Sequence, residues 1–219
     1  MQPGDLKVIN ITFETQDKYK SNKLEYQQID MNLNAISISD NIAFITAPYE
    51  MFHENGQQLK AYAQTLGFDT CFILTNSMGE NKYIASNNAF ENDNTDGKLT
   101  SFGVKTCRFV QGTAEVLIDT FADLLAQMKG VDPRDTIFDT YTVICRDQNG
   151  NAVKNVMVEL VGGGNTRNCS DADGTVTYYV YDGLEYTINV VKVPTGYSYD
   201  GAVVSFDENN TAIITVIAE

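Results

Sequence analysis

"FITAPYEMFHENG", residues 44–56, is the stretch in which the sequence changes from a strand pattern to a helix pattern. On its N-terminal side, residues 35–48 alternate between apolar and polar side chains around the turn-forming Ser39-Asp40-Asn41, which predicts two short strands joined by a hairpin. On its C-terminal side, the apolar residues of 50–66 recur at the spacing of one helical face. A strand that leads directly into a helix indicates an α/β unit.

The neighbouring segments extend this α/β pattern. Residues 7–13 alternate as a strand does, and "DTCFILT" (69–75) is a continuous apolar run, typical of a strand buried on both faces. The clearest helix is "GTAEVLIDTFADLLAQMKG" (112–130), in which the apolar residues form one stripe. Between these elements, the polar, turn-rich residues 86–101 predict a long loop, a kind of segment that is often functional.

Beyond a linker at 130–136, the period of the pattern is two throughout. Short alternating runs are separated by turn signals such as Asn149-Gly150 and Asp173-Gly174, and no helical pattern interrupts them. These features predict an α/β segment over 1–131 followed by an all-β sandwich over 132–219. The expected strands of the sandwich are 141–147, 156–162, 175–182, 186–193, 202–206 and 211–219.

Composition excludes several classes of protein. The 219 residues carry a net charge of −14, which argues against nucleic acid or an anionic membrane surface as a partner. The N-terminus has no signal-peptide pattern, and no apolar run reaches the roughly 20 residues that a transmembrane helix needs. The four cysteines contain no Cys-x-x-Cys pair, which excludes a thiolate zinc knuckle, whereas pairing of Cys145 with Cys169 stays open.

Glu50 and His53 have a spacing that metal sites use. On a helix, residues three apart share a face, so both side chains can reach one ion. A zinc site needs three or four protein ligands, however, and His53 is the only histidine in the chain. The alternative is structural: a solvated or capping histidine, and a carboxylate that complements the helix dipole. Spacing alone does not decide between the two.

Three blocks of the sequence resemble the neutral/alkaline ceramidase family, in the family's order. They are "NAISISDNIAFITAPYEMFHENGQQLK" (34–60), "TNSMGENKYIASNNAF" (75–90) and "RFVQGTAEVLIDTFADLL" (108–125). The resemblance implies a zinc ion held by Glu50, Tyr83 and two histidines from an upstream segment, with His53 as a bystander. It also implies that residues 1–131 are the C-terminal part of a larger catalytic domain. The implied reaction hydrolyses the amide of a ceramide-like lipid to sphingosine and a fatty acid.

The sequence departs from the family pattern in two places. Phe102-Gly103 stands where family members have Tyr-Glu, and that tyrosine is thought to hold the carbonyl oxygen of the substrate, so Phe102 is a substrate-proximal position without a hydroxyl. Tyr49 replaces a glycine where we expect the backbone to turn tightly. Glu115 also matches a family position, and we interpret it as a structural carboxylate in the first turn of a helix. A non-catalytic surface binding or adhesion protein on the same scaffold is therefore the alternative.

The C-terminal segment resembles the transthyretin-like sandwiches of the collagen-adhesin B-type and carboxypeptidase regulatory-like groups. The resemblance rests on Asp147, Asn149-Gly150, Asp173-Gly174, alternating valines from Val153 to Val158, and Pro194-x-Gly196-Tyr197. It implies an immunoglobulin-like or prealbumin-like fold and a secreted or cell-surface protein. The segment Asp171-Ala-Asp173-Gly174 has some calcium-loop character, but the later ligands are missing, so turn formation is the better interpretation.

Overall fold

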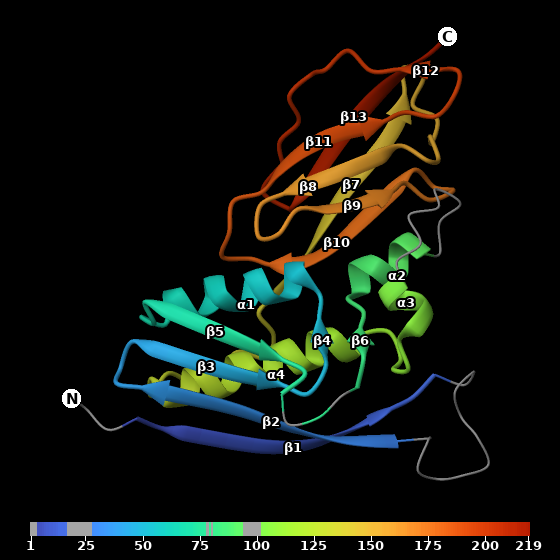
Figure 1. The fold of residues 1–219 in the computed structure, drawn as a ribbon. Coiled ribbons are helices and arrows are strands. Elements are labelled where there is room, and N and C mark those ends of the chain that lie inside the picture. The colour runs from blue at the N-terminus through green and yellow to red at the C-terminus, as the bar shows by residue number, and fades with distance from the viewer. Residues whose placement is uncertain (1–3, 17–27, 78, 80, 94–101) are drawn as a thin grey trace. The chain divides into compact units, whose positions relative to one another are not determined.

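The computed structural model describes residues 4–16, 28–77, 79, 81–93 and 102–219. By their contacts, the described residues form two compact units. Unit 1 comprises those within 1–86 and 102–137, and unit 2 comprises those within 87–101 and 138–219. Unit 1 combines a sheet with helices, and the strands of unit 2 form two sheets, so the predicted α/β segment and all-β sandwich are both confirmed (Figure 1).

Unit 1 is built on a four-stranded sheet in the order β1-β2-β3-β5. β1, β2 and β3 are antiparallel, and β5 runs parallel to β3. The predicted hairpin joins β2 to β3, and Ser39 in its turn has a φ of 55°. The strands are β1 (Leu6–Glu14), β2 (Gln28–Ile38), β3 (Ile42–Ala47) and β5 (Thr70–Thr75).

Two helices cover one face of this sheet. α1 (His53–Thr65) packs on β5, α4 (Thr113–Met128) packs on β1 and β2, and the two helices contact each other. Their apolar stripes, which include Leu59 and Phe121, are buried because they face the sheet and one another. Both predicted helices are present, although α1 begins three residues later than the pattern suggested. The two residues Glu50–Met51 form a separate strand, β4.

The opposite face of the sheet is open, and this corrects one expectation. Residues 69–75 were expected to be buried on both faces, but Phe72 and Leu74 of β5 are 47% and 43% exposed. The helices cover only one face, so the apolar side chains of the other remain at the surface. They form a cross-strand row, Leu6–Ile36–Phe44–Phe72, in which the Phe44 and Phe72 rings stack at 5.0 Å.

The sequence predicted a long loop over the polar segment 86–101, and this prediction is wrong in part. The segment contains α2 (Asn87–Asp93), which groups with unit 2, while residues 94–101 lie outside the described part of the chain. The buried Asn88 amide accepts from the backbone N–H of Tyr179 at 2.7 Å and donates to its carbonyl at 3.2 Å. The strand that contains Tyr179 lies at the edge of its sheet, and these bonds pair backbone groups that an edge strand otherwise leaves unpaired. The chain then returns to unit 1 at α3 (Phe102–Thr106).

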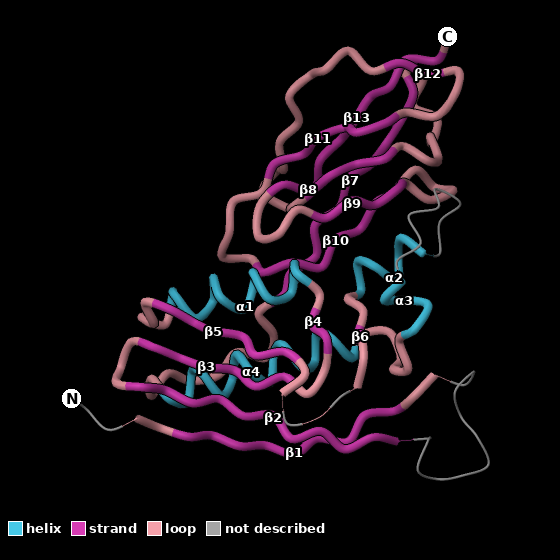
Figure 2. Tube along the Cα trace, in the orientation of Figure 1, coloured by secondary structure: helices cyan, strands magenta, loops and turns pink. Residues whose placement is uncertain are grey.

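Unit 2 is a sandwich of two sheets, ordered β10-β7-β13-β12 and β11-β8-β9 (Figure 2). Its core consists of alternate side chains from both sheets. β13 runs parallel to β7, and the predicted strand 202–206 is wrong, since only Val204 bridges to Ile188. The strands are β7 (Phe138–Asp147), β8 (Met157–Val161), β9 (Thr166–Cys169), β10 (Thr175–Tyr181), β11 (Thr187–Lys192), β12 (Tyr197–Ser198) and β13 (Thr211–Ala218).

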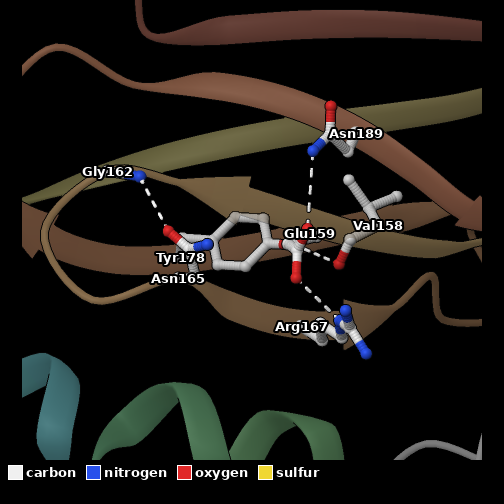
Figure 3. A network of polar contacts seen from close by, with 7 residues as sticks. All are labelled: Val158, Glu159, Gly162, Asn165, Arg167, Tyr178 and Asn189. Carbon is white, nitrogen blue, oxygen red and sulfur yellow. Dashed lines mark hydrogen bonds and ion pairs between the residues drawn. The ribbon is translucent and has the colours of Figure 1, made fainter.

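Two polar groups tie the strands of the sandwich together (Figure 3). Inside, the buried Tyr178 hydroxyl of β10 donates to the Val158 carbonyl of β8 at 2.8 Å and so links the two sheets. Outside, Glu159 accepts from Arg167 at 2.8 Å and from Asn189 at 3.4 Å, which connects the three strands of the smaller sheet. The inner bond matters more for stability because water does not compete for its partners.

The hairpin turns of unit 2 share one arrangement. Asp147, Asp171 and Asp207 each accept hydrogen bonds from the backbone N–H groups two and four residues later. The fourth residue of each turn has a positive φ. It is Gly150, Gly174 or Asn210. The Asp171 carboxylate therefore serves the turn, as predicted.

The cysteines and the helices bear on two further predictions. All four cysteines are buried free thiols, so Cys145 and Cys169 do not pair. Among the described residues, none of the helices has the length and apolar character needed to cross a bilayer.

Candidate functional site

The candidate site in unit 1 is organised by a bend after β3. The chain leaves the sheet at Ala47, bends at Pro48 and Tyr49, and continues into β4. The segment that follows β5 bonds to the backbone of this bend. Asn76 N–H donates to the Tyr49 carbonyl at 3.1 Å, and Asn81 N–H donates to the Pro48 carbonyl at 3.0 Å. These bonds fix the position from which Glu50 projects.

Tyr49 fits this bend because the bend needs no glycine. Its φ is not among the positive values, so a side chain is tolerated where the ceramidase pattern has glycine. The ring is 1% exposed, and the hydroxyl has no hydrogen-bond partner among the described residues. Burial, followed by the charge of Glu115, raises the pKa of the Tyr49 phenol far above its usual range. Glu115 is itself buried in the first turn of α4, at the position expected from the sequence.

Glu50 and Tyr83 lie directly opposite each other. β4 pairs in parallel with β6 (Tyr83–Ile84), Glu50 is in register with Tyr83, and the Glu50 N–H donates to the Lys82 carbonyl at 2.8 Å. The Glu50 carboxylate, as an acceptor facing the phenol and as a negative charge, raises the pKa of Tyr83. The two candidate ligand residues thus lie beside each other.

Two phenylalanines surround the Tyr83 ring. Phe52 and Phe102 each meet it edge to face, at centroid distances of 6.0 and 6.1 Å. Phe102, at the start of α3, is 70% exposed. The substrate-proximal position named from the sequence therefore lies beside Tyr83, and it presents an apolar ring to solvent instead of a hydroxyl.

Sequence reasoning missed the contact between Glu54 and Ser86. The Ser86 hydroxyl donates to the Glu54 carboxylate at 2.5 Å, which joins the first turn of α1 to the segment after β6. Removal from water raises the pKa of Glu54, and the bond from Ser86 opposes that rise. An acid in the first turn of the helix was visible in the sequence, but nothing local indicated its partner.

The described residues do not form a complete zinc site. Glu50 and Tyr83 are two oxygen ligands of suitable chemistry, whereas zinc takes three or four protein ligands. His53 is exposed, and no group of three or more His, Cys, Asp or Glu side chains within the described ranges could hold a metal ion. The chemistry of the two residues is compatible with zinc, but they are too few to hold it by themselves.

Comparison with known proteins finds similarity only at low identity. No family model and no curated protein matches the chain. Neutral ceramidase from Pseudomonas aeruginosa is 11% identical, covering 87% of this chain and 40% of that one, with a TM-score of 0.37. A ceramidase complexed with C2 is 9% identical, covering 85% and 39%, with a TM-score of 0.38. The Streptococcal ancillary pilin is 18% identical, covering 40% and 34%, with a TM-score of 0.32.

This chain spans two fifths or less of the length of each of these structures. Similarity at these identities and TM-scores assigns neither a family nor an activity.

Proposed function

We propose that this chain is part of a zinc-dependent amidohydrolase of the neutral ceramidase kind, which cleaves N-acylsphingosine to sphingosine and a fatty acid. In this proposal Glu50 and Tyr83 provide two zinc ligands, and histidines from outside the chain provide the others. The chain alone then lacks half of the metal site and is inactive. A ceramide-like lipid amide is the substrate, and the protein acts outside the cell or at its surface.

The observation that carries this proposal is the convergence of Glu50 and Tyr83. They come from different segments, the β4–β6 pairing puts them in register, and the Glu50 carboxylate raises the pKa of Tyr83. A tyrosine is an uncommon oxygen ligand of zinc. The ceramidase resemblance selects both Tyr83 and Glu50, and their position beside each other therefore supports a shared ion. Loss of the Tyr83 proton is required before both oxygens can bind a cation, because metal ligands must be deprotonated.

The remaining residues of the site have separate tasks in this proposal. A zinc ion, when bound, lowers the pKa of a water molecule and polarises the amide carbonyl. Glu50 and Tyr83 would hold this ion, since their backbone is fixed in the β4–β6 ladder. Phe52 and Phe102 flank Tyr83 and offer apolar surface to a lipid chain. Phe102 has no donor for the carbonyl oxygen, so carbonyl stabilisation depends on other groups.

The test uses the naturally encoded protein, including any residues that precede this chain. Zinc content and hydrolysis of a fluorescent short-chain ceramide are measured for the wild type and for Glu50→Gln. We expect Glu50→Gln to lose most of its zinc and activity, whereas Glu14→Gln, at an exposed position on β1, retains both. A wild type without zinc, or an active Glu50→Gln enzyme, would refute the proposed role of Glu50.

The second candidate is a non-catalytic surface binding or adhesion protein. Phe102 favours it, because an exposed phenyl ring occupies the place of a hydroxyl that the reaction uses in the ceramidase family. On this alternative the scaffold remains and the chemistry is lost. Restoring the hydroxyl at position 102 separates the two candidates.

A further inference from the structure

A groove lined by residues of unit 1 lies next to the Glu50–Tyr83 pair. Its apolar wall is formed by Met51 and Phe52 of the β4–α1 connection and by Ile73 of β5, and its polar wall includes His53 and Lys60 of α1. Its volume is about 170 Å³. Pockets for drug-sized ligands start at roughly 300 Å³, so this groove has room for a head group and a few carbons rather than a whole lipid.

The groove exists because of one glycine in α1. His53, Gly56 and Lys60 lie on successive turns of one helical face. A side chain at position 56 would begin 3.6 Å from Ile73 and 3.6 Å from the Met51 sulfur. Gly56 therefore leaves open the floor between the two polar side chains, although a glycine inside a helix costs about 1 kcal/mol relative to alanine.

The charge of the groove differs from that of the chain. The chain carries a net charge of −14, yet none of the described residues that line the groove is acidic, and Lys60 contributes a positive charge. Its ammonium group is close enough to the Cys71 thiol, beneath α1, to oppose the rise in the pKa of that thiol that burial causes. Lys60 is the one charged side chain, His53 aside, among the described residues that line the groove, and it favours an anionic ligand.

Phe52 connects this groove to the candidate site. It lines the groove and also meets the Tyr83 ring edge to face. Phe52 therefore connects the wall of the groove to the ring of Tyr83. Because the volume of the groove is about 170 Å³, most of an attached lipid chain lies outside it.

We infer that this groove binds the anionic head group of an amphiphile and so selects, among ceramide-like amides, those with a negatively charged head group. The amide part of this inference rests on the proposed function, whereas binding of the head group needs neither zinc nor catalysis. Lys60 and Gly56 determine the specificity: Lys60 pairs with the anion, and Gly56 provides the space.

The test compares two fluorescent probes with the same tail, a phosphorylated ceramide and a neutral ceramide, in zinc-free buffer below the concentration at which they form micelles. The wild type is expected to bind the phosphorylated probe about fivefold more tightly, as one exposed ion pair allows. Lys60→Gln removes this preference, Lys60→Arg keeps it, and Lys7→Gln on β1 serves as the matched control. A sulfonated probe distinguishes recognition of any anion from recognition of phosphate.

Gly56→Leu provides an independent variant, because leucine is a better helix former than glycine and fills the floor of the groove. We expect it to keep the circular dichroism of the wild type and to bind both probes more weakly. Equal affinity of the wild type for both probes, a preference that survives Lys60→Gln, or unchanged binding by Gly56→Leu would each overturn the inference. Glu50→Gln, which tests the proposed function, leaves the preference intact, so the two can fail separately.

Discussion

Tyr83 lies directly opposite Glu50 in the β4–β6 ladder, and the Glu50 carboxylate raises the pKa of the Tyr83 phenol. An acceptor and a negative charge beside a phenol both favour its protonated form. The proposed function places a cation at this position, and a cation would favour the deprotonated form instead.

The first prediction concerns the titration of Tyr83. In the wild type, Tyr83 should deprotonate above the ordinary value of about 10, and Glu50→Gln should bring its pKa back towards that value because the charge and the ionic acceptor are lost. NMR of isotope-labelled tyrosine measures this, with Tyr83→Phe assigning the signal among the 12 tyrosines. A titration that does not respond to Glu50→Gln would contradict the effect of Glu50 on the pKa of Tyr83.

The second prediction concerns Phe102. If the site is catalytic, Phe102→Tyr supplies a donor near the substrate carbonyl and raises the rate of ceramide hydrolysis by the naturally encoded protein, by up to about 10²–10³. Phe52→Tyr is the matched control, since it adds a hydroxyl on another ring that contacts Tyr83. Absence of hydrolysis in the wild type and in both variants would support the adhesion alternative.

The third prediction compares two buried tyrosines. Tyr178→Phe removes the donor to the Val158 carbonyl and should destabilise unit 2 by about 1–2 kcal/mol. Tyr49→Phe removes a buried hydroxyl that has no hydrogen-bond partner among the described residues, so it should leave the stability of unit 1 unchanged or raise it by up to about 1 kcal/mol. Hydrogen exchange, read separately for peptides of each unit, measures both, and a loss of stability in Tyr49→Phe would show an interaction at its hydroxyl.

The fourth prediction concerns the acid stability of unit 2. The Asn151 side chain, with backbone N–H groups of the turn, holds the pKa of Asp147 below its usual value. Because the folded-state pKa is the lower one, the stabilisation is present above the unfolded pKa of about 4 and is lost as the pH falls through the folded value. Asp147→Asn should therefore be less stable than the wild type at neutral pH, and the gap should narrow in acid.

Urea unfolding, followed by hydrogen exchange of the β7 peptide at several pH values, provides the measurement for Asp147. Asp173→Asn is the control, because it lies in a comparable turn and no bond to its carboxylate was found among the described residues. A gap that is independent of pH would contradict a lowered pKa for Asp147.

Several elements could be predicted because their signals are local. The strands of the hairpin at 35–48, the helix at 112–130 and the aspartate turns each follow from a period or a turn residue within a few positions. Tertiary context changed the rest. The apolar run 69–75 predicts a strand buried on both faces, but among the described strands β5 pairs with β3 alone, and Phe72 and Leu74 are exposed. The sequence did not predict α2, because its segment is polar. Its Asn88 side chain bonds to the backbone of Tyr179, which is distant in the sequence.

By itself, the sequence determined the two fold classes and named Glu50, Tyr83 and Phe102, because hydrophobic period and motif resemblance are properties of the linear chain. Only the tertiary structure decided that Glu50 and Phe102 each lie beside Tyr83 and that Gly56 leaves space between Met51 and Ile73. The physical reason is that β4 and β6 are two residues long, too short to show a period. Their pairing is set by the path of the chain around them.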